Sequence, residues 1–237
     1  MKKIGIIIST IIIISLAILL LWYNGIIIFN YPLKSKYVIR GVDVSSHQGD
    51  IDWNVLSKQG IMFAYIKATE GRSFVDKKFS INYENANKTN LKVGAYHFFR
   101  PDSTGEEQAD NFIKTVPKLE DTLPPVVDIE FYEDNVEETQ KQLQNMLNKL
   151  EEYYGKKPII YATYEAYDLF IANHFNEYYI WIRDVYFKPK LKDNREWTFW
   201  QYSNRTRLKG YRGKEKRIDM NVFNGDMKRF EELYLYQ

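Results

Sequence analysis

The chain has 237 residues, no cysteine and a formal net charge of +2. The lack of cysteine excludes disulfides, thiolate metal sites, a cysteine nucleophile and a lipoprotein anchor. The near-neutral charge gives no case for nucleic-acid binding, and the basic residues clustered between Arg205 and Arg217 suit a solvated loop near an anionic cell envelope.

Residues 1–29 have the pattern of a membrane anchor. Two lysines precede an apolar run that ends at Trp22, about the 20 residues that a helix needs to cross a bilayer. A cleavable signal peptide has a shorter apolar core and ends in a small-x-small site, which this segment lacks. We therefore expect a single-pass signal anchor in the cell membrane, with the remainder exported to the periplasmic or extracellular side. Secretion after signal cleavage is the alternative.

The orientation follows from the charges that flank this span. The lysines at the start favour a cytoplasmic N-terminus, and the basic residues Lys34, Lys36 and Arg40 on the far side weaken that bias.

After a short linker, residues 30–37, the remaining residues 38–237 have the length of one domain with a substantial core. Eight segments of this domain have the apolar, β-branched and aromatic content of strands. They are Ile39–Ser45, Phe63–Thr69, Lys92–Phe99, Val126–Phe131, Pro158–Tyr164, Tyr179–Asp184, Thr198–Tyr202 and Ile218–Val222.

Helical patterns separate the early strands. Ser103 and Glu106 fit a capping box, and so do Asn135 and Glu138, whose helix is expected to end at Gly155. Strands that alternate with helices indicate parallel βαβ units, and eight of them suggest a barrel.

The later spacers depart from this regular pattern. The segments that follow Asp184 and Ser203 show no apolar period of 3.6. We therefore expect a barrel that has lost or shortened its last helices.

Asp128 and Glu130 form an acidic pair within the apolar segment Val126–Phe131. A strand alternates its side chains, so both carboxylates point to one face, about 6.6 Å apart along the backbone. Burying two like charges side by side is costly, and such pairs are typical of acid–base enzymes, above all glycoside hydrolases. An edge strand with solvent-facing acids is the alternative.

Three other strands deliver charged residues at the same level. The chemistry of a β/α barrel lies at the C-terminal ends of its strands. Asp43 lies in the first strand, Lys67 shares a face with Tyr65 and Thr69 in the second, and Asp219 lies in the last. We expect the acids to meet at one mouth, with Lys67 as both counter-ion and substrate contact.

Aromatic and histidine side chains are weaker candidates. Five rings are expected either to stack on sugars or to pack in the core: Tyr65, Tyr96, Phe98, Tyr161 and Trp181. His97 is interpreted as a packing residue, His47 as near substrate and His174 as a surface residue. Three scattered histidines predict no zinc site, and an acidic cluster that includes Lys67 argues against calcium. No metal or cofactor is expected.

These segments resemble glycoside hydrolase family 25, the Chalaropsis-type lysozymes or N-acetylmuramidases, in order from about Arg40 to Asn224. The resemblance rests on Asp43-Val44-Ser45 with Gln48-Gly49, Ile66–Gly71, Gly94–Phe98, Asp128-Ile129-Glu130, Trp200–Ser203 and Ile218–Asn221. It implies an α/β fold, an irregular, flattened TIM-like barrel of eight strands with reduced helices in the C-terminal part. It also implies a substrate contact at Gln201.

The resemblance further assigns roles to the acids. Glu130 would be the general acid that protonates the glycosidic oxygen. Asp128 would stabilise charge near C1 or orient the 2-acetamido group of the substrate. Asp43 and Asp219 would hold this pair in position. Retention of anomeric configuration is implied, and a covalent intermediate and acetamido participation both remain open.

Arg183 departs from the family pattern. The family has an alanine two residues after the tryptophan that corresponds to Trp181. If Trp181 faces the cleft, Arg183 does too, and it would narrow the cleft or pair with Asp184 or with a substrate carboxylate.

The sequence thus predicts a monomeric, membrane-tethered lysozyme that cuts β-1,4 bonds between N-acetylmuramic acid and N-acetylglucosamine in peptidoglycan glycan strands. A chitinase-like hydrolase and a non-catalytic peptidoglycan-binding protein on the same fold are the alternatives. Retention of all four acids favours catalysis over binding alone.

Overall fold

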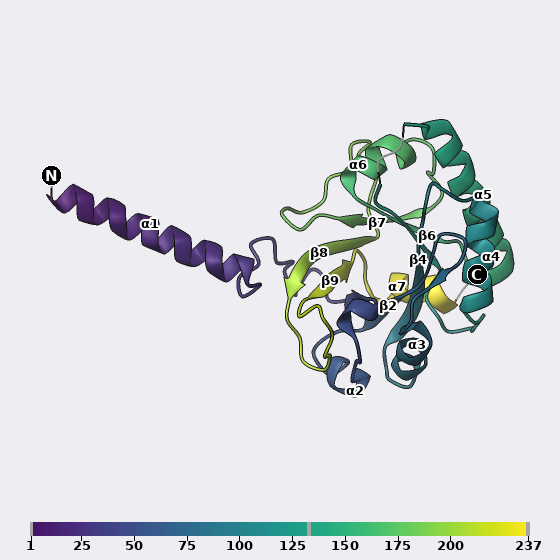
Figure 1. Ribbon diagram of the computed structural model, residues 1–237, viewed down its shortest axis with the longest axis horizontal. Coiled ribbons are helices and arrows are strands. Elements are labelled where there is room, and N and C mark those ends of the chain that lie inside the picture. Colours follow the sequence, from purple (N-terminus) through teal and green to yellow (C-terminus); the bar gives the residue numbers. More distant parts are fainter. Residues whose placement is uncertain (1, 132–133, 236–237) are drawn as a thin grey trace.

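The computed structural model describes residues 2–131 and 134–235 (Figure 1). Its centre is a closed ring of strands in the order β1-β9-β8-β7-β6-β5-β4-β2, in which β2 pairs again with β1. A further short strand, β3, adds to β2 in antiparallel orientation. The strands are β1 (Arg40–Val44), β2 (Phe63–Glu70), β3 (Phe74–Val75), β4 (Lys92–Phe98), β5 (Val126–Ile129), β6 (Ile159–Ala162), β7 (Tyr179–Arg183), β8 (Phe199–Thr206) and β9 (Ile218–Phe223). The predicted strands and barrel are confirmed, and β3 was not predicted.

The last strand differs from the parallel order that the alternation predicted. β9 runs antiparallel to both β8 and β1, whereas the other neighbours in the ring are parallel. Parallel neighbours need a crossover connection of about a dozen residues or more. Residues 184–198 cross from β7 to the parallel β8 without a helix, whereas the shorter segment 207–217 returns the chain from β8 in the opposite direction. This reversal places Asp219, the second residue of β9, opposite Asp43 of β1.

Two apolar layers stabilise the barrel. Val127 and Ile129 of β5 point outward and join the core beneath the helices. Phe63, Tyr65 and Phe199 fill the inside of the ring, where the centroids of the Phe63 and Phe199 rings lie 5.2 Å apart, edge to face. Because side chains alternate along a strand, the outward position of Val127 and Ile129 turns the residues between and beside them inward.

The helices that cover the outside of the ring are α2 (Trp53–Leu56), α3 (Phe79–Asn87), α4 (Gly105–Thr115), α5 (Val136–Tyr154) and α6 (Tyr164–Ala166), with single turns η1 (Ser46–Gln48) and η2 (Tyr167–Ile171). α7 (Met227–Leu235) packs against the inner cluster instead, where the ring centroids of Phe230 and Phe63 lie 5.8 Å apart. The long helices α4 and α5 pack against each other on the side of the barrel opposite the N-terminal helix (Figure 1). Residues 184–198 and 207–217 contain no helix, which confirms the predicted loss.

The caps of the two long helices follow the sequence closely. Asn135 caps α5 by accepting a hydrogen bond from the backbone N–H of Glu138, and Gly155 ends this helix in the left-handed conformation, as predicted. α4 begins one residue later than predicted, because Thr104 and Glu107 form its capping box. Two overlapping pairs fit the capping pattern there, and the pattern alone does not rank them.

α1 (Lys2–Tyr23) extends away from the barrel (Figure 1). An 18-residue window within Lys3–Tyr23 has a mean hydropathy of 3.0, and none of its residues is buried. This length and composition suit a membrane span, and a signal sequence has the same character.

The predicted linker, residues 30–37, lies against the barrel. The side-chain amide of Asn30 donates to the backbone carbonyls of Asp184 (3.2 Å) and Tyr202 (3.0 Å). Tyr37 is buried, and its ring centroid lies 5.7 Å from that of Trp197. These contacts attach the segment to the outer wall of the domain that it precedes.

Candidate active site

A cleft of about 360 Å³ opens at the mouth of the barrel. Every predicted site residue except Tyr65 lines it: Asp43, Asp128, Glu130, Asp219, Lys67, Tyr96, Phe98, Tyr161, Trp181, Arg183 and Gln201. Ser45, His47, Val126 and Asn204 complete the lining. Of these four, only His47 was expected near substrate, because the loop after the first strand was recognised as part of the mouth.

The acids converge from three strands. Asp43 and Asp219 face each other across β1 and β9. Asp128 lies opposite Phe98 on one side and Tyr161 on the other. Asp128 is buried, whereas Glu130, just beyond the end of β5, is exposed. The predicted pair therefore has one member inside the cleft and one at its rim.

Burial raises the pKa of three of these carboxyls. The pKa of Asp128 lies well above its ordinary range because the group is buried, and the charges of Glu130 and Asp43 raise it further, whereas Lys67 lowers it. Burial is also the main cause of the raised pKa values of Asp43 and Asp219. These three aspartates therefore keep their protons to a higher pH than free carboxyls do.

A network of neutral side chains fixes Asp43. Its Oδ2 atom accepts hydrogen bonds from the amides of Asn221 (2.7 Å) and Gln201 (3.0 Å). The hydroxyl of Tyr161 donates to Gln201 Oε1, and the indole N–H of Trp181 donates to Asn221 Oδ1, both at 3.0 Å. Because the amide oxygens are held by these donors, the amide N–H groups point at the carboxylate.

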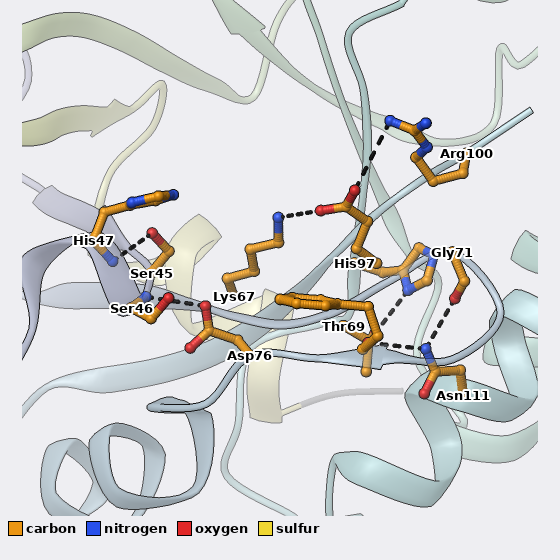
Figure 2. Close-up of polar contacts among 12 residues, drawn as sticks. Ser45, Ser46, His47, Lys67, Thr69, Gly71, Asp76, His97, Arg100 and Asn111 are labelled. Atoms are coloured by element: carbon orange, nitrogen blue, oxygen red, sulfur yellow. Dashed lines mark hydrogen bonds and ion pairs between the residues drawn. The ribbon is translucent and has the colours of Figure 1, made fainter.

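Lys67 contacts an acid that the sequence did not single out. Its ammonium lies 2.7 Å from the carboxylate of Glu70, and the guanidinium of Arg100 lies 3.9 Å from the other oxygen of that group (Figure 2). Lys67 is a counter-ion within the acid cluster, as predicted, but its direct ionic contact is to Glu70, three residues along the same strand. Lys67 acts on Asp128 through its field.

Thr69 does not share a face with Tyr65 and Lys67, which corrects the prediction. The register of β2 against β4 shifts between Lys67 and Thr69, and this irregularity turns Thr69 outward. Its hydroxyl is hydrogen bonded to Nδ1 of His97 at 2.7 Å (Figure 2). The other ring nitrogen of His97 contacts Gln108 at 3.0 Å, and burial lowers the pKa of His97 to about 4. His97 is thus a neutral packing residue, as predicted.

The aromatic candidates fall into three groups. Tyr65 is wholly buried, with its hydroxyl donating to the carbonyl of Pro124 at 3.3 Å, so of its two expected roles it packs in the core and does not contact a sugar. It lies two residues before Lys67, one layer below the mouth. Tyr161 and Trp181 form the buried floor of the cleft, while Tyr96 and Phe98 are half-buried in its wall.

Arg183 and Trp181 both face the cleft, as their spacing predicted. The charge of Arg183 lowers the pKa of Asp219, opposing the effect of burial. Asp184, one of its predicted partners, instead accepts hydrogen bonds from the backbone N–H groups of Tyr186 (3.0 Å) and Phe187 (2.7 Å). The guanidinium thus adds a cation to an acidic cleft.

No group of histidine, aspartate and glutamate side chains within the described ranges has the arrangement of a metal site. Acids at the mouth of a closed β/α barrel, flanked by aromatic rings, are the equipment of a glycoside hydrolase.

The comparisons with known proteins agree with this class. The family model described as glycosyl hydrolases family 25 matches residues 42–211, and the chain belongs to this family. A family 25 glycosyl hydrolase structure from Bacillus anthracis is 55% identical, with a TM-score of 0.81, and the match covers 86% of this chain and 97% of that one. The bacterial lysozyme from Streptomyces coelicolor is 32% identical, with a TM-score of 0.73 and coverage of 83% and 97%. Lysozyme M1 of Streptomyces globisporus is 33% identical over 207 residues, which cover 81% of this chain and 69% of the relative.

Proposed function

We propose that this glycoside hydrolase is a lysozyme that cuts the β-1,4 bond between N-acetylmuramic acid and N-acetylglucosamine in peptidoglycan. The observation that carries the proposal is the meeting of Asp43, Asp128, Glu130 and Asp219 in one cleft, on a family 25 barrel. Relatives named lysozyme and N,O-diacetylmuramidase support the choice of substrate.

Glu130 is the proton donor in this proposal. Its exposed position at the rim lets it reach a glycosidic oxygen from the open side of the cleft. Its proton passes to that oxygen as the bond to C1 breaks, and the resulting carboxylate then takes a proton from the water that attacks C1. The anomeric configuration is retained when C1 is first captured by an enzyme carboxylate or by the acetamido oxygen.

Asp128 is the partner that acts on the sugar at C1 or C2. Its Oδ1 atom is buried and has no hydrogen-bond partner among the residues that the structure describes. A buried carboxyl oxygen without a partner is costly, so a substrate group that bonds it gains affinity. The 2-acetamido group of the sugar has the matching donor and acceptor, and its orientation by Asp128 would place its oxygen next to C1.

Asp43 and Asp219 position this chemistry. The amides of Asn221 and Gln201 hold Asp43, and Asp43 in turn faces Asp219 across the strand pair. Arg183 and Lys67 supply positive charge at the two sides of the acid cluster, where they attract the lactyl or peptide carboxylate of muramic acid.

The decisive experiment is mass spectrometry of purified sacculi digested with the wild-type protein and with Glu130→Gln. The wild type should produce new reducing N-acetylmuramic acid ends. Glu130→Gln should lower the rate by roughly 10²- to 10⁴-fold, the usual contribution of a general acid. The exposed helix residue Glu152, which lies outside the cleft, provides the matched control Glu152→Gln.

Each alternative predicts a different result. If Glu130→Gln turned over sacculi at the wild-type rate, the acid would lie elsewhere. Cleavage of chitin oligomers without cleavage of sacculi would replace the lysozyme assignment. Binding of sacculi without new reducing ends would establish a wall-binding protein.

We also propose that α1 remains attached as a membrane anchor, so that the enzyme acts as a monomer close to its own membrane. Cell fractionation and the mass of the mature protein test this proposal. A soluble product that has lost the apolar segment would show secretion instead.

A further inference from the structure

Two large aromatic side chains stand exposed on the loop after β7. The exposed fractions are 58% for Tyr186 and 75% for Phe187. This loop lies on the side of the barrel that α1 approaches, together with the connection between β8 and β9 (Figure 1). Aromatic side chains at this position relative to a membrane-spanning helix are typical of the lipid–water interface.

The end of α1 is joined to both of these segments. The centroids of the Trp22 and Tyr186 rings are 6.3 Å apart. The guanidinium of Arg205 lies 4.3 Å from the centroid of the Trp22 ring. Arg217 lies 5.0 Å from the Tyr23 ring and donates to the Tyr23 carbonyl at 2.9 Å. The end of α1 therefore packs against the barrel. This contact holds the loop after β7 and the β8–β9 connection close to the end of α1, where a membrane-spanning helix would leave the bilayer.

This surface is strongly basic. Residues 205–217 contain a single acid, Glu215, and the basic residues Arg205, Arg207, Lys209, Arg212, Lys214, Lys216 and Arg217. All of the basic residues except Arg205 and Arg217, which contact the end of α1, are exposed. Exposed cations close to a bilayer are attracted by anionic lipid headgroups, and this attraction falls off within about 10 Å at moderate salt.

We propose that the loop 184–190 and the segment 205–217 form a bilayer-docking face that binds anionic phospholipid headgroups, with Phe187 inserted at the interface. The proposal rests on the retention of α1. Charge complementarity and continuity with the end of an apolar helix identify the occupant as an anionic bilayer. The face fixes the orientation of the barrel as well as its distance from the membrane.

The docking face also lies beside the catalytic cleft. A hollow that continues the cleft beyond Asp43 and Asp219 is bordered by Glu215 and Arg217, which belong to the docking face. Docking therefore presents the cleft to glycan strands that lie next to the membrane.

The cysteine-free chain makes a direct test possible. Phe187→Cys, labelled with an environment-sensitive fluorophore, would be reconstituted as full-length protein in vesicles of phosphatidylcholine alone or mixed with phosphatidylglycerol. Leu119→Cys, an exposed position after α4, is the matched control. We expect a blue shift and quenching by lipid-bound nitroxide for the label at position 187 in the anionic vesicles. The label at position 119 should report an aqueous environment in both kinds of vesicle.

Replacing exposed basic residues of the docking face by neutral ones tests whether their charge drives binding to anionic lipid. The changes Lys209→Gln, Arg212→Gln, Lys214→Gln and Lys216→Gln, combined with the label at 187, should reduce the blue shift in anionic vesicles to that in neutral ones. An aqueous signal in anionic vesicles, with α1 shown to resist carbonate extraction, would overturn the proposal. A blue shift of equal size in neutral and anionic vesicles would also overturn it. The same holds for a blue shift with a soluble anionic wall polymer but not with vesicles. These readouts do not depend on catalysis, so a failed lysozyme assay would not affect them.

Discussion

At the scale of the residue, the acidic pair shows that two similar carboxyl groups can differ in burial because their surroundings differ. Asp128 and Glu130 are two positions apart, yet one is buried beside Asp43 and the other is exposed at the rim. The alternation of a strand predicted their shared face but not their different depths, because depth depends on where the strand ends within the barrel wall.

Replacement of Asp128 by Asn should stabilise the protein increasingly as the pH rises. The pKa of Asp128 is raised in the folded state, chiefly by burial. The Asp128 carboxyl therefore contributes its full stabilisation of the folded state below the ordinary pKa of about 3.9. This contribution is lost as the pH rises through the raised pKa of the folded state. Asn stays neutral and avoids this loss. Thermal unfolding at acidic and neutral pH should show a difference in melting temperature, variant minus wild type, that grows with pH.

The exposed Asp168 provides a control for this comparison. Asp168→Asn should leave the melting temperature nearly unchanged across the same pH range, since surface substitutions usually alter stability by less than about 0.5 kcal/mol. A difference for Asp128→Asn that does not vary with pH would show that the folded state does not favour the protonated acid.

At the scale of the element, β4 depends on a glycine for packing rather than for backbone freedom. A Cβ atom added to Gly94 would lie 2.2 Å from the ring of Tyr65, which is wholly buried inside the barrel. Gly94→Ala should therefore destabilise the protein by about 1–3 kcal/mol, the usual cost of overpacking a core. Denaturant unfolding measures this loss of stability. Gly60→Ala provides a contrast, because a Cβ atom at position 60 would have no atom within 4 Å and the substitution tests only backbone strain.

A second substitution, at Tyr65, tests whether the Tyr65 ring is the cause of this loss of stability. Tyr65→Leu removes buried contacts and is destabilising by itself, so the comparison is a double-mutant cycle. Gly94→Ala should cost less in the Tyr65→Leu background than in the wild type, because the shorter side chain makes room for the added methyl group. An equal cost in both backgrounds would rule out the Tyr65 contact as the cause.

At the scale of the whole molecule, the segment before the barrel belongs to the folded unit. Tyr37 is buried, and Asn30 donates to two backbone carbonyls of the barrel. A chain that begins at residue 30 should have a slightly lower unfolding free energy than one that begins at residue 24, because it lacks Ile28, which is partly buried against the core. A chain that begins at residue 38 should lose roughly 2–5 kcal/mol, from a buried aromatic ring and about two hydrogen bonds. Equal stability of all three chains would show that these contacts contribute nothing.

The fold was largely predictable because it repeats simple periods. Alternation of apolar strands and capped helices located the eight strands of the ring and the helices α4 and α5. The direction of β9 was not predictable from its own residues, which fit either orientation. It was decided by the connection before it, residues 207–217, which is shorter than the crossover that a parallel neighbour needs.

The sequence by itself determined the barrel, the apolar N-terminal helix and most of the residues that line the cleft, because each follows from local periodicity and from polar residues placed at strand ends. Only the tertiary structure decided which groups meet. It paired Lys67 with Glu70, turned Thr69 outward through an irregular register, and buried Tyr65 beneath the mouth. The physical reason is that depth, register and charge partners depend on neighbouring strands, which a single strand's sequence does not specify.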